Sequence, residues 1–320
     1  MNALPRRVRL VEVGLRDGLQ AVPDPVLATR DKVRIVAGLI DAGVREIEAV
    51  SFAHPSVLPQ LADAEDVMAG VPRVPGVAYR GLVPNARGAR RAAACGLDEI
   101  VAVISADEQV SIRNQRRTVT QMLAELPDIA ASARSCGARL VVGVACSFFA
   151  PARGPVPWEE TSRVVDAAVN AGAAGVYLAA TSGMEHPGEV GAGVERLRDR
   201  HPGLDVGVHL HNRNGLAMAN ALAAMAAGAD WLEGAFGGLG GDLWFPGDPT
   251  VLGNAPMEDL IHLCDSMGIS SGIDLAGYLG VVHDVEKLIG RASTSFVTRG
   301  GTRTDLATAS WPTGTSGEGP

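Results

Sequence analysis

Residues 41–50 read DAGVREIEAV, a unit in which a helical segment ends at a glycine and an apolar, β-branched run follows. The same order returns further along the chain as ACGLDEIVAV (94–103), SCGARLVVGV (135–144), NAGAAGVYLA (170–179) and AAGADWLEGA (226–235). Glycine suits the left-handed residue that ends a helix. A recurring helix–glycine–strand unit predicts an α/β protein with a parallel sheet.

Counting the strand-like runs refines this prediction. Eight runs are candidates, and they cover residues 8–14, 45–51, 77–83, 98–105, 139–146, 175–180, 205–211 and 230–236. They recur about every 30 residues, as eight units of a (β/α)8 TIM barrel require. This pattern favours the barrel over an open doubly wound sheet, and no GxGxxG motif follows the first run.

The barrel prediction also divides the chain. We expect one TIM-barrel catalytic domain over residues 1–290, with extra helices after residue 268. The remaining residues, 291–320, are rich in glycine, serine and threonine, which predicts a disordered C-terminal tail.

Composition narrows the range of partners. The net charge is −8 and aromatic residues make up only 4% of the chain, which disfavours nucleic-acid binding. No apolar run reaches 18 residues, so we expect no membrane span, and the N-terminus lacks the pattern of a secretory signal. Four widely spaced cysteines without a CxxC pair suit a reducing compartment, which predicts a cytoplasmic protein.

A pair of histidines suggests where the chemistry lies. Residues 207–215 read GVHLHNRNG, and the two-residue period of a strand puts His209 and His211 on one face. Catalytic groups of this fold sit at the C-terminal ends of the strands, where the first strand is followed by Arg16 and Asp17. If the ring closes, Asp17 and the two imidazoles converge. Such a set can hold a divalent cation that acts as a Lewis acid.

Each of these features alone has a simpler explanation. Paired strand histidines are often structural, an Arg–Asp pair after a strand is commonly a surface ion pair, and GGLGG (237–241) is an ordinary flexible turn. Their coincidence at one end of one predicted barrel is what favours a metal site.

Several motifs, in order, resemble those of a known family. The first strand, VEVGLRDGLQ (11–20), resembles that of the 3-hydroxy-3-methylglutaryl-CoA (HMG-CoA) lyases, which belong to the DRE-TIM metallolyases. Similar stretches follow over residues 8–285, among them IEAVSFAHPSVLPQLADAEDV (47–67), LVPNARGARRA (82–92), VHLHNRNGLAMANALAA (208–224), GGLGG (237–241) and GNAPMEDL (253–260).

The resemblance implies roles for matching positions. It implies a divalent cation (Mg²⁺ or Mn²⁺, with Zn²⁺ or Co²⁺ as alternatives) and a small-molecule substrate that can be a CoA thioester. Arg16 would stabilise an enolate oxygen, while Glu48 would line the pocket or orient Arg16. The implied metal ligands are Asp17, His209, His211 and Asn254, and the implied substrate contacts are Gln20, Ser111, Asn114 and Thr181.

Two positions depart from the family pattern. The lyases carry a catalytic cysteine after the glycine loop, where this chain has Asp242, and an aspartate at the end of strand six, where it has Ala180. Asp242 is then the candidate catalytic acid or base, although an unperturbed carboxyl has a pKa of about 4. We therefore expect carbon–carbon lyase chemistry, a retro-aldol cleavage or its reverse, on a related β-hydroxyacyl substrate rather than on HMG-CoA itself.

Two other functions fit the same residues. One is a Claisen-type acyltransferase that joins acetyl-CoA to a 2-oxo acid, although only about 50 residues follow the barrel, fewer than such synthases usually carry. The other is a barrel that has lost catalysis and serves as a binding subunit. A homodimer is the expected assembly.

Overall fold

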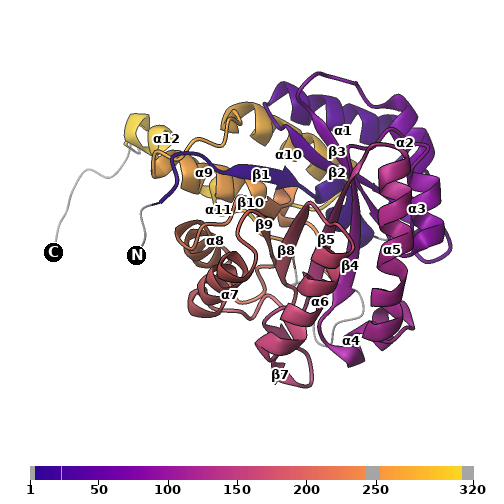
Figure 1. The fold of residues 1–320 in the computed structure, drawn as a ribbon. Helices are drawn as coiled ribbons and strands as arrows, with labels where there is room; N and C mark the ends of the chain where they lie inside the picture. The colour runs from indigo at the N-terminus through magenta and orange to yellow at the C-terminus, as the bar shows by residue number, and fades with distance from the viewer. Residues whose placement is uncertain (1–3, 23, 242–252, 312–320) are drawn as a thin grey trace.

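The computed structural model describes residues 4–22, 24–241 and 253–311 and confirms the predicted barrel. Eight parallel strands close into a ring in the order β1-β10-β9-β8-β5-β4-β3-β2 (Figure 1). The strands are β1 (Arg9–Glu12), β2 (Glu46–Ser51), β3 (Ala78–Val83), β4 (Glu99–Ser105), β5 (Arg139–Ala145), β8 (Gly175–Ala180), β9 (Asp205–Leu210) and β10 (Trp231–Gly234). A small antiparallel hairpin of β6 (Phe149–Ala150) and β7 (Gly154–Pro155) was not predicted.

Helices cover the outside of the ring (Figure 1). They are α1 (Thr29–Asp41), α2 (Ala64–Gly70), α3 (Ala86–Ala92), α4 (Glu108–Gln115), α5 (Val119–Ser135), α6 (Trp158–Asn170), α7 (Pro187–Arg200), α8 (Ala217–Ala226), α9 (Met257–Ser266) and α10 (Leu275–Ile289). In α1 the buried residues are Lys32, Ile35, Val36, Leu39 and Ile40, the spacing of one helical face against the sheet. Gly43 follows with a φ of +96°, as the helix–glycine–strand pattern predicts.

The interior of the ring holds its own small core. Inward and outward side chains alternate along each strand. The inward ones that form this core are Val11, Val13, Val101, Val141, Tyr177, Ala179, Trp231 and Ala235. Below this layer, at the N-terminal ends of the strands, the buried Arg80 forms ion pairs with Glu46, Glu99 and Glu233. The C-terminal ends of the strands are left to form the mouth of the barrel.

The segment after residue 290 differs from the prediction of a disordered tail. Residues up to 311 include two short helices, α11 (Phe296–Gly300) and α12 (Arg303–Thr308). The carboxylate of Asp259 in α9 accepts hydrogen bonds from the Ser295 hydroxyl and from the amides of Phe296 and Val297. A few polar contacts to one buried acid therefore order a stretch whose composition alone suggests disorder.

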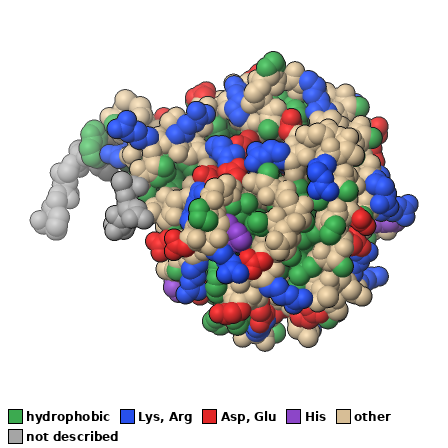
Figure 2. Space-filling model, viewed as in Figure 1, with side chains coloured by type: hydrophobic (Ala, Val, Ile, Leu, Met, Phe, Trp, Pro, Cys, Tyr) green, Lys and Arg blue, Asp and Glu red, His purple; other side chains and the backbone are tan. Residues whose placement is uncertain are grey.

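On the face in Figure 2, acidic and basic side chains are interspersed, and no continuous basic patch is visible there. Among the described residues, no helix is both long enough and apolar enough to cross a membrane.

Candidate metal and active site

The strand β1 leads directly into a tight turn that presents Arg16 and Asp17. Residues Gly14–Gly18 form a single π-helical turn, η1, in which the Val13 carbonyl accepts hydrogen bonds from the amides of Arg16, Asp17 and Gly18. A side chain at Gly14 would not fit, because a Cβ there would lie 2.6 Å from the Glu12 carboxylate and from the Phe236 ring. The turn buries both charged side chains, with Arg16 5% exposed and Asp17 4% exposed.

The two histidines of the second motif meet Asp17. His209 lies on β9 and His211 just beyond it, and their Nε2 atoms are 3.2 Å apart. The Asp17 Oδ2 atom is 3.4 Å from Nε2 of His211 and 3.7 Å from Nε2 of His209. One ligand atom from each of the three buried residues lies within 4.8 Å of the others, which is a grouping able to hold a metal ion.

Hydrogen bonds on the far side of each ring fix this orientation. The Nδ1 atom of His209 lies 3.0 Å from Glu233 Oε2, and Nδ1 of His211 lies 2.7 Å from the Thr181 carbonyl oxygen. These acceptors keep the proton on Nδ1 and leave both Nε2 lone pairs facing Asp17, as in protein metal sites generally.

Asn254 lies beside Asp17, and its side chain shows whether this group of residues suits a cation. Its Nδ2 donates to Asp17 Oδ2 at 2.7 Å and to the Leu239 carbonyl at 2.8 Å, while its buried Oδ1 has no hydrogen-bond partner among the described residues. A half-turn of the amide exchanges the two atoms and would bring the unpartnered oxygen to the cluster. Two imidazoles, a carboxylate and an amide oxygen form a donor set that suits a divalent cation.

Arg16 is held in place from two sides. Its Nη1 donates to Asp17 Oδ1 at 2.5 Å and its Nη2 donates to Glu48 Oε2 at 2.9 Å, while Gln20 Nε2 donates to Asp17 Oδ1 at 2.7 Å. Within the described part of the chain, Arg16 Nε and Glu48 Oε1 are buried without a hydrogen-bond partner. Glu48 therefore orients Arg16, one of the two roles considered for it, and both side chains keep an atom available to a ligand.

The charges set the protonation states of these groups. Burial by itself would raise the pKa of Asp17, but Arg16 and the two histidines offset it and hold that pKa well below its usual range. Burial raises the pKa of Glu48, and Arg16 offsets this only in part. Burial lowers the pKa of His211, but hydrogen bonding and attraction to Asp17 outweigh it and raise that pKa overall. Asp17 is thus ionised, so it can serve as a ligand but not as an acid.

The other predicted residues lie in different surroundings. The Thr181 hydroxyl accepts a hydrogen bond from the Cys146 amide, and the residue reaches the site only through its carbonyl. Ser111 is buried in α4, where its hydroxyl donates to the Arg117 carbonyl, and Asn114 is exposed on the same helix. Asp242 lies outside the described residues. Ala180 is fully buried in the core around the ring.

Sequence reasoning missed Glu233, the partner of His209. Its other oxygen accepts from Arg80 Nη1 and Trp231 Nε1, each at 3.2 Å, so it joins the floor of the barrel to the metal ligands. The signal was present in DWLEG (230–234), because Trp231 and Glu233 share the inward face of their strand and an inward acid needs a partner.

Comparison with known proteins agrees with this geometry. A family model described as HMGL-like matches residues 7–285. The (R)-citramalyl-CoA lyase of Chloroflexus aurantiacus is 34% identical over 304 residues, which cover 92% of this chain and 95% of that protein. The hydroxymethylglutaryl-CoA lyase of Bacillus subtilis is 33% identical, over 90% of this chain and 95% of that protein.

Solved structures give the same assignment. The structure of an HMG-CoA lyase from Acinetobacter baumannii in complex with coenzyme A and 3-methylmalate superposes with a TM-score of 0.91 at 32% sequence identity. The match covers 98% of this chain and 100% of that one. The resemblance inferred from the motifs is therefore confirmed: the chain belongs to the HMGL-like family and is a lyase.

Proposed function

We propose that this lyase breaks a carbon–carbon bond in a β-hydroxyacyl-CoA thioester by retro-aldol cleavage, at the site formed by Asp17, His209 and His211 beside Arg16. The observation that carries the proposal is the convergence of these buried side chains from opposite ends of the chain. The relatives act on citramalyl-CoA and hydroxymethylglutaryl-CoA, as their names state, and the two are nearly equally similar to this chain.

The cleavage needs three functions from the site. The proton leaves the β-hydroxyl as that carbon becomes a carbonyl, the bond to the neighbouring carbon breaks, and its electron pair forms the enolate of the thioester, which is then protonated. A divalent cation, Mg²⁺ or Mn²⁺ first and Zn²⁺ or Co²⁺ as alternatives, would be held by Asp17, His209, His211 and Asn254 and would polarise the substrate oxygens.

The protein's own groups then divide the remaining work. Arg16 offers a permanently charged donor to the enolate oxygen, and Glu48 holds the guanidinium in position through its Nη2. Gln20 steadies Asp17 through its Oδ1. Asp242, which lies outside the described residues, is our candidate for the proton transfer that the family cysteine performs, and Ser111, Asn114 and Thr181 remain proposed substrate contacts.

The substrate is expected to resemble HMG-CoA without being identical to it. The family aspartate at the end of strand six contacts the substrate hydroxyl, and its place is taken here by Ala180, whose methyl group cannot do so. Citramalyl-CoA and HMG-CoA are the first two thioesters to assay, because they differ by one methylene between the hydroxyl-bearing carbon and the carboxylate.

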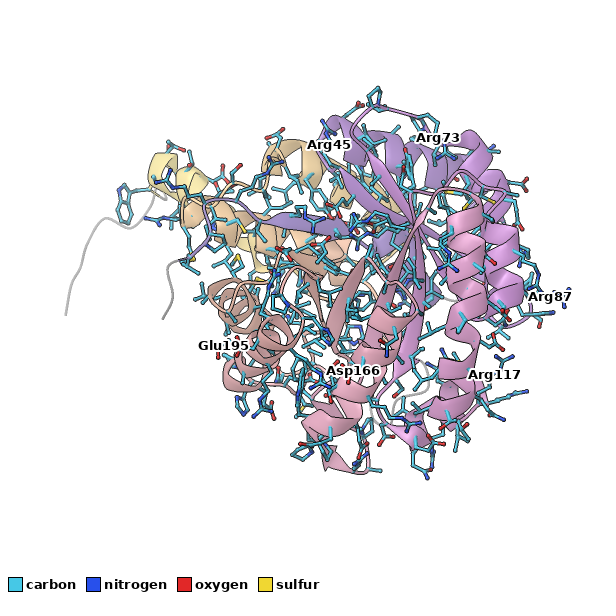
Figure 3. All side chains as sticks on the ribbon, in the orientation of Figure 1. Arg45, Arg73, Arg87, Arg117, Asp166 and Glu195 are labelled. Carbon is cyan, nitrogen blue, oxygen red and sulfur yellow. The ribbon has the colours of Figure 1, made fainter. Side chains whose placement is uncertain are left out.

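Metal removal tests the proposal. Protein stripped with a chelator should lose cleavage of whichever thioester the metal-loaded enzyme cleaves, and added Mn²⁺ or Mg²⁺ should restore it. Asp17→Ala should lower kcat/KM by at least about 1,000-fold and abolish Mn²⁺ binding in a calorimetric titration. The control is Asp166→Asn, on the outer face of α6 (Figure 3), where Asp166 pairs only with Arg200 and His201 among the described residues. Activity that survives both chelation and Asp17→Ala would exclude the proposal.

We also propose that the enzyme is a cytoplasmic homodimer, following the cysteine pattern and the usual symmetry of domains of this size. Light scattering coupled to size-exclusion chromatography measures the assembly directly, and a monomer at micromolar concentration would contradict it.

A further inference from the structure

One buried polar group of the barrel interior has no role in the chemistry described so far. Tyr177 points inward from β8, is only 2% exposed, and packs with its ring centroid 6.0 Å from that of His209. Among the described residues its hydroxyl makes no hydrogen bond. A tyrosine hydroxyl in such surroundings normally finds a hydrogen-bond partner, so this one is available to a ligand.

The neighbouring strand is shaped to admit the phenol. Gly143 on β5 pairs in register with Tyr177, and a Cβ at Gly143 would lie 2.2 Å from the tyrosine Cζ and 2.4 Å from its hydroxyl oxygen. The head of the side chain therefore lies against the bare backbone of Gly143. Val103 on β4 and Ala145 on β5 are inward residues that are only partly buried, so this side of the ring stays open toward the mouth.

The hydroxyl lies among the charged groups of the site and stays a donor. A phenol has an ordinary pKa of about 10, so the Tyr177 hydroxyl carries its proton at neutral pH and can donate a hydrogen bond.

The strand register gives the depth of this donor. On β8 and β9, Ala179 pairs with His209, whereas Tyr177 pairs with Gly207, two residues closer to the barrel floor. Coenzyme A is too large to enter a ring filled with side chains, so a bound thioester must keep its CoA part in the mouth. The part of the acyl group that extends past the metal ligands is then the part that reaches Tyr177.

We propose that the Tyr177 hydroxyl donates a hydrogen bond to an oxygen at the end of the acyl group remote from CoA, and so selects acyl groups that carry a carboxylate there. Tyr177 is thus a substrate-binding and specificity-determining residue on the floor of the site. The inference rests on the proposed function for the orientation of the substrate, and it adds to that function the residue that recognises the remote oxygen.

A binding experiment with two non-cleavable thioesters tests this. 3-Methylglutaryl-CoA carries the carboxylate, isovaleryl-CoA has a hydrogen atom in its place, and neither has the hydroxyl that cleavage requires. In calorimetric titrations of the Mn²⁺-loaded enzyme, Tyr177→Phe should weaken 3-methylglutaryl-CoA by about tenfold to a hundredfold and leave isovaleryl-CoA within about twofold. The affinity for Mn²⁺ itself should not change.

Tyr79→Phe is the matched control. Tyr79 on β3 is equally buried but packs in the core outside the ring, and its hydroxyl donates to the Pro72 carbonyl rather than toward the mouth. It should leave both affinities unchanged. A second variant, Gly143→Ala, displaces the phenol without removing it, because its Cβ would clash with the ring. It should also selectively weaken the binding of 3-methylglutaryl-CoA.

The outcomes separate this inference from the proposed function. Equal weakening of both thioesters by Tyr177→Phe, or no weakening of either, would overturn the role assigned to Tyr177 even if the wild-type enzyme cleaves HMG-CoA or citramalyl-CoA. A wild-type enzyme that cleaves neither thioester but shows the selective loss of binding would overturn the cleavage proposal and support the assignment of Tyr177.

Discussion

Both ends of the barrel interior contain buried charged side chains, but these are paired with one another at one end and only partly paired at the other. At the N-terminal end, buried or half-buried charges pair with one another around Arg80, and the group comprises Arg9, Glu46, Arg80, Glu99, Arg139, Asp205 and Glu233. At the C-terminal end, Arg16, Glu48 and Asn254 each retain a buried atom without a hydrogen-bond partner among the described residues. Buried polar groups are normally satisfied, so the unpartnered ones mark where a ligand is expected.

The difference separates stability from function within one ring. At the N-terminal end the charges neutralise one another and hold the strands together, since even Arg80 Nε and Glu99 Oε2, which make no hydrogen bond among the described residues, lie 2.6 Å apart as an ion pair. At the mouth some buried polar atoms have no hydrogen-bond partner among the described residues, so donors and acceptors are available for the proposed cation and substrate. In (β/α)8 barrels generally, the C-terminal face carries the chemistry and the opposite face contributes stability.

The largest stability effect should come from removing the centre of the paired end. Arg80→Met leaves Glu46, Glu99 and Glu233 without their shared, 1% exposed cation and should cost about 3–5 kcal/mol of unfolding free energy, measured by urea titration. Arg200→Met, which removes an exposed partner of Asp166 on the outer surface, is the control and should leave the midpoint unchanged. A midpoint for Arg80→Met equal to that of the wild type would show that the paired end is not a stability element.

Glu233 contacts Arg80 at the N-terminal end and His209 at the C-terminal end. Its substitution therefore tests whether the two ends depend on each other. Glu233→Gln replaces one acceptor oxygen by an amide nitrogen, so it cannot serve His209 and the donors of Arg80 and Trp231 together. We expect Mn²⁺ affinity to fall about 10- to 100-fold, measured by calorimetry. Glu46→Gln is the matched control, since it also faces Arg80 but has no contact with His209, and should leave the Mn²⁺ affinity unchanged. Unchanged affinity in Glu233→Gln would mean that His209 is held by other contacts.

Glu12 is a buried acid without a paired arginine, and it should make stability depend on pH. Burial raises the pKa of Glu12 to about 8, although it accepts hydrogen bonds from the Gly14 and Phe236 amides and from the Tyr278 hydroxyl. An exposed glutamate titrates near pH 4.3, so between that pH and about 8 the folded chain holds a proton that the unfolded chain releases. This contribution is complete below the lower pKa and is lost as the pH rises through the upper one, by up to about 1.4 kcal/mol per pH unit.

Glu12→Gln should flatten this dependence. A carboxamide imitates the protonated acid, because its oxygen accepts from both amides while its nitrogen donates to the Tyr278 oxygen. Urea unfolding of the metal-free protein at several pH values between 5 and 8 measures the slope. Glu195→Gln, on the exposed surface of α7 (Figure 3), should keep the wild-type slope. Parallel slopes for Glu12→Gln and the wild type would contradict the prediction.

The sequence predicts the ring much better than the details of its mouth. All eight ring strands were found from their apolar runs, because burial on both faces leaves a strong local pattern. The π-helical turn at Gly14–Gly18 was not predicted, since its conformation depends on Glu12 and Phe236, which are far apart in the chain. The ordered helices after residue 290 were missed for the same reason, because Asp259 supplies their anchor.

The candidate site was predicted in the same uneven way. Asp17, His209, His211, Asn254 and Arg16 could be identified because the motifs that carry them resemble a family and fall at strand ends. Glu233 and Tyr177 lie on strands without such motifs, so only the three-dimensional arrangement brings them to the site. Ser111 and Asn114 were chosen from a loop match, and their surroundings on α4 show no contact with the other predicted residues within the described chain.

The closure of the ring between β1 and β10 also sets an order of events during synthesis. Asp17 and Asn254 lie 237 positions apart in the chain, and they meet only when the last strand has joined the first. A growing chain therefore has no cation site until about four-fifths of it has left the ribosome, and its open strand edges remain exposed until then. An ion that binds only the closed form pulls the final step forward by mass action. If the proposed cation binds there, it stabilises the ring after the strands have assembled, and metal supply would then affect the yield of folded enzyme as well as its activity.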